Sequence, residues 1–247
     1  MRNTRLFLLS FLGFLLACPL RAGYTAPTFG GFRKVLYVGD SLTVGPFGRE
    51  MQSFLCEQFS ENRVYMYASC GSSPEHWLDS EPTYLSKCGC RVKTPSTFLL
   101  REFEKGQPPK PFATPKLIPL LEQIHPTSVV VQLGTNWFDL LEQHPGADEM
   151  TRLSALLDHF VDTIQSAPGR PALLWITPPD SARFRAIQGN VTKLLVSAGR
   201  RKRFTIIDSS SMVRYEPGQS GNDGVHYFGA DAMRWAEGVK KRLRLLL

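Results

Sequence analysis

The strongest constraint on the fold of this chain is a short apolar run, Val35 to Val38, which stops at Gly39. A run of this length that ends at a glycine is typical of a buried strand in a parallel sheet. Asp40 and Ser41 would then follow the C-terminal end of a strand, where open α/β sheets bind their ligands. From this stretch alone, Ser41 is either a nucleophile or a turn residue that caps the next helix.

Strands and helices alternate along the rest of the chain. Besides the first strand, apolar and β-branched runs predict four strands, at Val64 to Ala68, Ser128 to Leu133, Ala172 to Ile176 and Phe204 to Ile207. Amphipathic patterns predict helices at Phe47 to Phe59, Pro115 to Ile124, Glu149 to Ile164, Ser181 to Gly199 and Ala230 to Leu247. Joined by right-handed crossovers, these elements give a three-layer α/β/α sandwich with a parallel five-stranded sheet.

Residues 75 to 114 do not follow this alternation. The stretch has no clear periodicity, and it holds Trp77, Tyr84, Cys88 and Cys90. It is too long for a simple connection, so we interpret it as an ordered insertion in a single domain that spans residues 23 to 247. A mobile loop without a catalytic role is the alternative.

The first residues have the pattern of an export signal. Two arginines within the first five residues precede an apolar run, Leu6 to Leu16, which is too short to span a membrane comfortably. Leu15 to Cys18 resembles a bacterial lipobox, which would attach the protein to a membrane through lipidated Cys18. Cleavage by an ordinary signal peptidase after Ala22 is the alternative. In both cases residues 1 to 22 are a leader, and we expect a periplasmic, extracellular or lipid-anchored envelope protein.

Four cysteines follow this leader: Cys56, Cys70, Cys88 and Cys90. An even number in an exported chain favours disulfides, and four cysteines can pair in three ways. The sequence does not choose among these pairings, although a bridge between Cys88 and Cys90 would close a very tight ring; we favour Cys70 with Cys88. Neither the Cys88-Gly89-Cys90 spacing nor the scattered histidines form a zinc-binding pattern, so we expect no metal and no cofactor.

The formal net charge of +7 is modestly basic. It either favours anionic surfaces such as cell wall or lipid headgroups, or it serves solubility. The basic residues contain no nucleic-acid-binding motif, so nucleic acid is not an expected partner.

Small polar turns follow several of the predicted strands. Ser41, Gly71 and Asn136 lie in these turns, which meet at one edge because the carboxyl ends of parallel strands point the same way. Asp223 and His226 precede the last helix. A serine hydroxyl is a poor nucleophile unless a base removes its proton. His226 can be that base, and Asp223 can orient its imidazole.

Together these blocks resemble the SGNH hydrolases, also called the GDSL family. Gly39 to Leu42 matches the first block of the family, Gly71 the second, Gly134 to Asn136 the third, and Asp223 to His226 the last. Each block alone is weak evidence. All four occur in the family's order over nearly the whole chain after the leader, which favours the catalytic interpretation of Ser41.

The resemblance implies a serine ester hydrolase that acts through an acyl-Ser41 intermediate, with His226 as the base and Asp223 as the acid of a catalytic triad. It also implies an oxyanion hole, formed by the backbone N–H groups of Ser41 and Gly71 and by the side chain of Asn136. A glycine suits the second position because the backbone must approach the substrate closely.

The substrate is predicted from residues that follow these blocks closely, namely Trp77, Trp137, Phe138 and Tyr227. We expect them to surround the nucleophile, with core packing as the alternative for each. Aromatic faces suit sugar rings and acyl chains. With export, they favour the removal of acetyl groups from a glycan or cell-wall polysaccharide. The alternatives are an O-acetyltransferase with the same triad, a lipase- or lysophospholipase-type esterase, and a non-catalytic glycan-binding envelope module.

Overall fold

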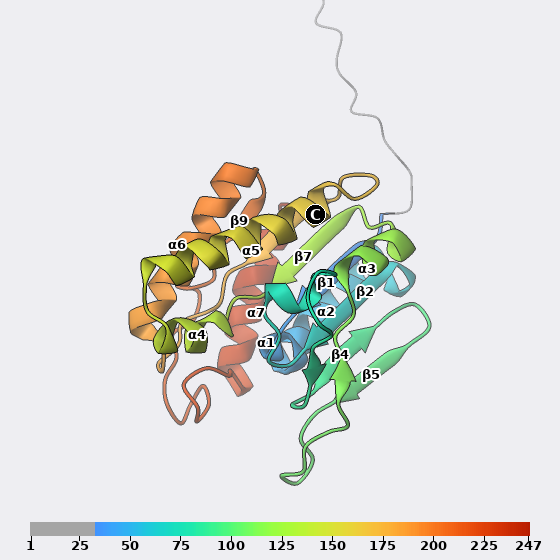
Figure 1. Cartoon of the computed structure of the whole chain (residues 1–247). Coiled ribbons are helices and arrows are strands. Elements are labelled where there is room, and N and C mark those ends of the chain that lie inside the picture. The colour runs from blue at the N-terminus through green and yellow to red at the C-terminus, as the bar shows by residue number, and fades with distance from the viewer. Residues whose placement is uncertain (1–32) are drawn as a thin grey trace, which may run out of the picture. The chain divides into compact units, whose positions relative to one another are not determined.

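The computed structural model of the chain describes residues 33 to 247. They form a seven-stranded sheet in the order β5-β4-β2-β1-β7-β8-β9, with helices on both faces (Figure 1). The α/β/α sandwich predicted from the sequence is therefore confirmed. The predicted leader, with Cys18, lies outside the described residues. Within residues 33 to 247, no helix is long and apolar enough to cross a membrane.

Five neighbouring strands are parallel, and they are the five that the sequence predicts. In sheet order they are β2 (Val64–Ser69), β1 (Val35–Gly39), β7 (Ser128–Gln132), β8 (Ala172–Ile176) and β9 (Thr205–Ile207). Every residue of β1 and β7 is buried. Strands that are covered on both faces have continuous apolar sequences, which explains why these two were easily recognised.

The sheet is not all parallel, and the five-stranded prediction is incomplete in this respect. Two antiparallel strands of the insertion, β4 (Cys90–Lys93) and β5 (Phe98–Arg101), extend the sheet beyond β2. The insertion also contains the 3-10 helix η2 (Pro74–Trp77) and a small sheet of β3 (Leu85–Ser86) and β6 (Phe112–Ala113). Segments of two to four residues are too short to produce a recognisable period.

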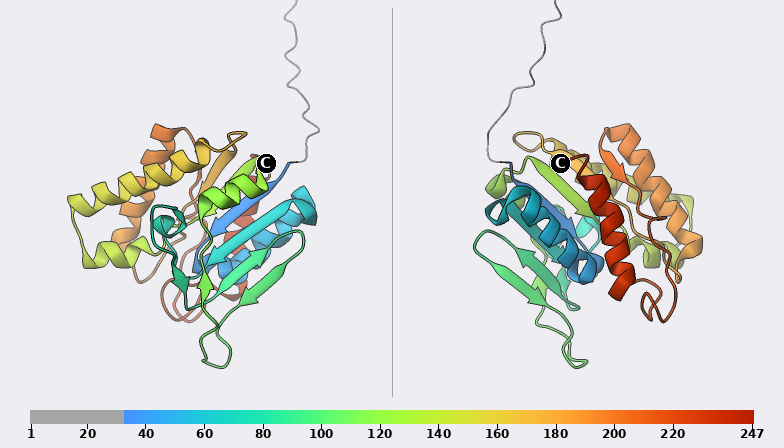
Figure 2. Two further views of the ribbon diagram at one scale, coloured as in Figure 1. Left: turned by 45° about the vertical axis from the view of Figure 1, so that its right-hand side comes forward. Right: turned by 180° about the vertical axis from the view of Figure 1, so that it is seen from behind.

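Helices cover both faces of the large sheet (Figure 2). One layer consists of α1 (Ser41–Val44), α2 (Pro46–Phe59) and α7 (Gly229–Leu243). The other consists of α3 (Leu117–Ile124), α4 (Trp137–Gln143), α5 (Ala147–Gln165) and α6 (Arg185–Lys202). Alternate residues of β1 enter the two cores: Val35 and Tyr37 the first, Leu36 and Val38 the second. The sequence did not predict α1 and α4, which are only one or two turns long.

A disulfide ties the insertion to the parallel sheet. It joins Cys70, directly after β2, to Cys88, two residues before the start of β4, which is the pairing that we favoured. Cys56 and Cys90 are free thiols. The backbone N–H of Cys70 also donates to the carbonyl of Gly89 at 3.0 Å, so the two segments are held together by a covalent and a hydrogen bond.

We expect the Cys70→Ala, Cys88→Ala double variant to unfold more easily than the wild-type protein. The two cysteines are 18 residues apart, and a cross-link over such a loop restricts the unfolded chain. Its loss should lower the free energy of unfolding in urea by about 3 kcal/mol. Cys56→Ala, which removes a free thiol, is the control and should cost much less. Equal losses in the two variants would contradict the prediction.

Candidate active site

Ser41 is the first residue of α1, two residues beyond the end of β1. Asp40 caps this helix, since its buried carboxylate accepts a hydrogen bond from the Leu42 N–H at 2.9 Å. Gln132, at the end of the neighbouring strand β7, donates its amide to the other oxygen of Asp40 at 3.4 Å and accepts the hydroxyl of Thr43 at 2.8 Å. The turn that carries Ser41 is therefore bonded to the adjacent strand.

The structure brings Ser41, Asp223 and His226 together from opposite ends of the chain. Nε2 of His226 lies 2.8 Å from Oγ of Ser41, and Nδ1 lies 2.5 Å from Oδ2 of Asp223. In this arrangement a histidine can remove the proton of the serine while the carboxylate holds the imidazole in place.

The environment of Asp223 favours its ionised form. Partial burial alone would raise the pKa of this carboxyl group. Hydrogen bonds from the backbone and side chain of His226 and from the backbone of Val225 outweigh burial, and they lower the pKa of Asp223 below its ordinary value. Asp223 is thus negatively charged at neutral pH and can stabilise a protonated imidazole.

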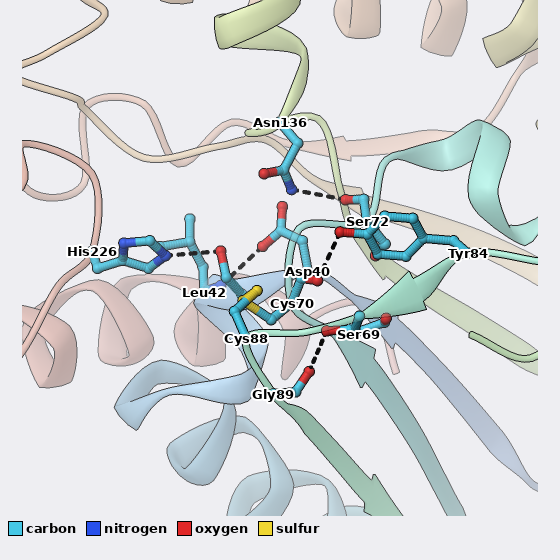
Figure 3. The surroundings of a disulfide bond; sticks show 12 residues. Asp40, Leu42, Ser69, Cys70, Ser72, Tyr84, Cys88, Gly89, Asn136 and His226 are labelled. Atoms are coloured by element: carbon cyan, nitrogen blue, oxygen red, sulfur yellow. Dashed lines mark hydrogen bonds between the residues drawn. A yellow bond between two sulfur atoms is a disulfide. The ribbon is translucent and has the colours of Figure 1, made fainter. Parts of the chain in front are cut away.

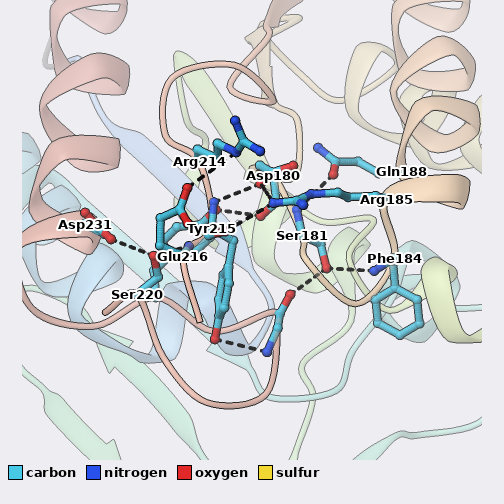
Figure 4. A network of polar contacts seen from close by, with 12 residues as sticks. Asp180, Ser181, Phe184, Arg185, Gln188, Arg214, Tyr215, Glu216, Ser220 and Asp231 are labelled. Atoms are coloured by element: carbon cyan, nitrogen blue, oxygen red, sulfur yellow. Dashed lines mark hydrogen bonds and ion pairs between the residues drawn. The ribbon is translucent and has the colours of Figure 1, made fainter. Parts of the chain in front are cut away.

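A polar network holds the loop between β9 and α7, which carries the acid and the base (Figure 4). Gly224 has a φ of +80°, its N–H donates to the Tyr215 hydroxyl at 3.0 Å, and its carbonyl accepts the Ser181 hydroxyl at 2.7 Å. The N–H of Tyr215 in turn donates to the carboxylate of Asp180 at 2.8 Å. Sequence analysis did not identify Asp180 and Tyr215, because no spacing relates these residues to the blocks that they support.

Gly71 lies in the turn after the disulfide cysteine Cys70. Its φ is +79°, and a Cβ at this position would lie 2.3 Å from Oη of Tyr84, so a larger residue would be strained and obstructed. The side-chain amide of Asn136 donates to the carbonyl of Ser72 at 2.8 Å, which brings it beside the same turn (Figure 3). Among the hydrogen bonds of residues 33 to 247, none uses the backbone N–H of Ser41 or Gly71. These groups are available to an oxyanion.

A cavity of about 650 Å³ opens beside Ser41 and His226. It lies between the start of α2, the β4–β5 hairpin and the residues after His226. Its apolar lining includes Leu42, Val44, Phe47, Phe98, Leu100, Phe103, Tyr227, Phe228 and Trp235. Sequence analysis missed the contribution of the insertion, because Phe98, Leu100 and Phe103 belong to a stretch without clear periodicity.

Three of the four aromatic residues that we expected around the nucleophile lie elsewhere. Trp77, Trp137 and Phe138 are buried in the core between the sheet and the layer of α3 to α6, with at most 1% of each residue exposed. There they cannot contact a ligand of this cavity, so the core-packing alternative applies to them. Tyr227 lines the cavity, although it too is almost fully buried.

We expect ionisation of Asp40 to destabilise the folded protein. Burial raises the pKa of Asp40 from 3.8 to about 6, so the folded state prefers the protonated carboxyl group more than the unfolded state does. The free energy of unfolding should therefore fall by about 3 kcal/mol as the pH rises from below 4 to above 6.

Asp40→Asn keeps an acceptor for Leu42 and cannot ionise, so it should not show this contribution. Urea unfolding of both proteins from pH 4 to pH 8 measures the difference between the two curves. Curves that stay parallel over this range would contradict the assignment.

No protein-family model matches the sequence. No curated protein matches it either. Solved structures do match. An aryl esterase from M. smegmatis shares 13% identity with a TM-score of 0.56, covering 87% of this chain and 100% of its own. A carbohydrate acetylesterase family member from Sinorhizobium meliloti shares 16% identity with a TM-score of 0.56, covering 87% and 99%.

A peptidoglycan O-acetylesterase shares 12% identity with a TM-score of 0.54, covering 88% of this chain and 92% of its own. At such identities the similarity establishes the fold. The structural similarity extends over nearly all of the described residues, and the similar structures are esterases of more than one kind. The chain therefore shares the fold of these esterases, as expected from the resemblance of its four sequence blocks to the SGNH hydrolases.

Proposed function

We propose that the protein is a carboxylic ester hydrolase that acts through an acyl-Ser41 intermediate. The observation that carries this proposal is the hydrogen-bonded series Ser41, His226 and Asp223. Two of its members, Ser41 and His226, line a cavity that can hold a substrate. Ser41 Oγ attacks the ester carbonyl while His226 Nε2 takes its proton. The protonated imidazole then gives that proton to the departing alcohol. His226 then deprotonates a water molecule, whose oxygen attacks the acyl carbonyl. The bond between the acyl group and Oγ breaks, the acid leaves, and the protonated imidazole returns its proton to Ser41 Oγ.

The negative oxygen of each tetrahedral intermediate needs donors that are already in place. The backbone N–H groups of Ser41 and Gly71 can supply two of them. Asn136 can supply a third, because a primary amide has two N–H donors and its bond to the Ser72 carbonyl uses only one. That bond orients the amide before any substrate arrives.

For the alcohol part of the ester we propose a glycan of the cell envelope. Two structural neighbours, a carbohydrate acetylesterase and a peptidoglycan O-acetylesterase, support this choice. Arg49 and Glu102 are exposed and line the cavity, where they can hydrogen-bond to sugar hydroxyls. The leader predicted from the sequence would export the enzyme to such a substrate, and a disulfide suits an oxidising compartment. Transfer to a sugar hydroxyl in place of water is the O-acetyltransferase alternative.

We expect Ser41→Ala to abolish the hydrolysis of p-nitrophenyl esters, because Ser41 Oγ is the hydroxyl that His226 Nε2 contacts and can deprotonate. The value of kcat should fall by at least about 10⁴-fold, while the fold, followed by circular dichroism, stays intact. Ser96→Ala, an exposed serine between β4 and β5, is the matched control. Full activity in the Ser41→Ala variant would refute the proposed mechanism.

Asn136→Ala should lower kcat about 100- to 1000-fold, the usual effect of losing one oxyanion donor. Because the amide is needed mainly in the transition state, KM should change much less. Asn190→Ala, an exposed asparagine on α6, removes the same group away from the site and should have no effect. A rise in KM at unchanged kcat would instead assign Asn136 to substrate binding.

A further inference from the structure

We propose that the cavity beside Ser41 binds the acyl part of the ester, and that this acyl group is an aliphatic chain of medium length. The inference rests on the proposed esterase function, and it replaces the acetyl group predicted from the sequence with a longer one.

Exposed apolar side chains gather at this cavity. Phe98, Leu100, Phe103 and Phe228 are 57%, 38%, 55% and 53% exposed, and all four line it. Single exposed apolar side chains are common on protein surfaces, whereas a group of them around a cavity marks a place where an apolar ligand binds.

The insertion builds the outer wall of this cavity. Side chains alternate along a strand, so Phe98 and Leu100 lie on the same face of β5, the edge strand of the sheet. Leu100 is paired with Arg91 of β4. The buried guanidinium of Arg91 donates to the Val44 carbonyl at 3.0 Å and to Gln52 Oε1 at 3.3 Å, so two of its five N–H donors are used within the wall.

The inner wall is apolar as well. Phe47 of α2 and Trp235 of α7 stack with nearly parallel rings, and Tyr227 packs at an angle against Trp235. These three side chains are buried beneath the cavity and belong to the core on this face of the sheet. The inner wall of the cavity is therefore formed by side chains that are packed in the hydrophobic core.

The position of Ser41 assigns the acyl part to this cavity. Ser41 and the residues that follow it, Leu42 and Val44, all line the cavity, so a chain bonded to Ser41 Oγ enters it directly. An acetyl group would leave most of the apolar lining in contact with water, whereas each added methylene removes apolar surface from water. A cavity of about 650 Å³ is in the usual range for pockets that enclose small ligands.

The first experiment measures kcat/KM of the wild-type protein for p-nitrophenyl acetate, butyrate, hexanoate and octanoate. We expect hexanoate to exceed acetate by at least about tenfold, since a half-open cavity gives part of the roughly fourfold gain per fully buried methylene. A flat profile, or a preference for acetate, would overturn the proposal while leaving the esterase function in place.

The second experiment tests whether the side chains of the outer wall cause the preference for longer acyl chains. The Phe98→Ala, Phe103→Ala double variant should lower the ratio of kcat/KM for octanoate to kcat/KM for acetate by about fivefold or more, because it removes two apolar side chains from the cavity wall. Both residues are exposed, so the fold should tolerate the change. Ile118→Ala, an apolar residue of α3 that is 43% exposed and does not line the cavity, is the control and should leave the ratio unchanged. An unchanged ratio in the double variant would overturn the proposal.

A binding measurement separates this proposal from the proposed function. Octanoate and acetate are titrated into the Ser41→Ala variant in a calorimeter, with the Phe98→Ala, Phe103→Ala changes added in a second protein. Tighter binding of octanoate that is lost in the second protein supports the cavity, even if no ester is hydrolysed. Absence of octanoate binding would overturn the proposal, whatever the esterase assay shows.

Discussion

The candidate site depends on the parallel pairing of β1 with β2 on one side and β7 on the other. In this register Gly39 lies opposite both Ala68 and Gln132, so the three strands end together at one edge of the sheet. The turns that carry Ser41, Gly71 and Asn136 begin at this edge. Residues nearly 100 positions apart thus meet because of backbone hydrogen bonds, and the buried Asp40–Gln132 contact bonds the turn that carries Ser41 to the end of β7.

The base reaches the site in a different way. The loop between β9 and α7 has no strand to hold it, and side chains take over this role: the Tyr215 hydroxyl, the Ser181 hydroxyl and the Asp180 carboxylate each bind its backbone or a neighbouring segment. The bond from Asp223 to His226 then orients the imidazole. One half of the site is positioned by the sheet and the other by a side-chain network, so substitutions in that network would affect His226 while leaving the oxyanion donors in place.

The sequence predicted those parts of the molecule that repeat a pattern. The five parallel strands were found because buried strands are continuously apolar, and Ser41 and His226 because small turns follow strands and a base must accompany a serine nucleophile. The strands β4 and β5 were missed because they are short and largely exposed along β5. Trp77, Trp137 and Phe138 were expected around the nucleophile because they follow the blocks in sequence. The short helices η2 and α4, which form after β2 and β7, direct these side chains into the core instead.

The insertion connects the chemistry of the site with its shape. Its Tyr84 hydroxyl lies against Gly71, its Cys88 is bonded to the residue before Gly71, and its β5 strand forms the outer wall of the cavity. None of these groups belongs to the series Ser41, His226 and Asp223, which the parallel sheet and the last loop hold independently. A change in the length or sequence of β5 could therefore alter which acyl group fits without disturbing the proton transfers. The cavity wall and the triad are in this sense separable parts of one site, and the irregular insertion is the part that can vary.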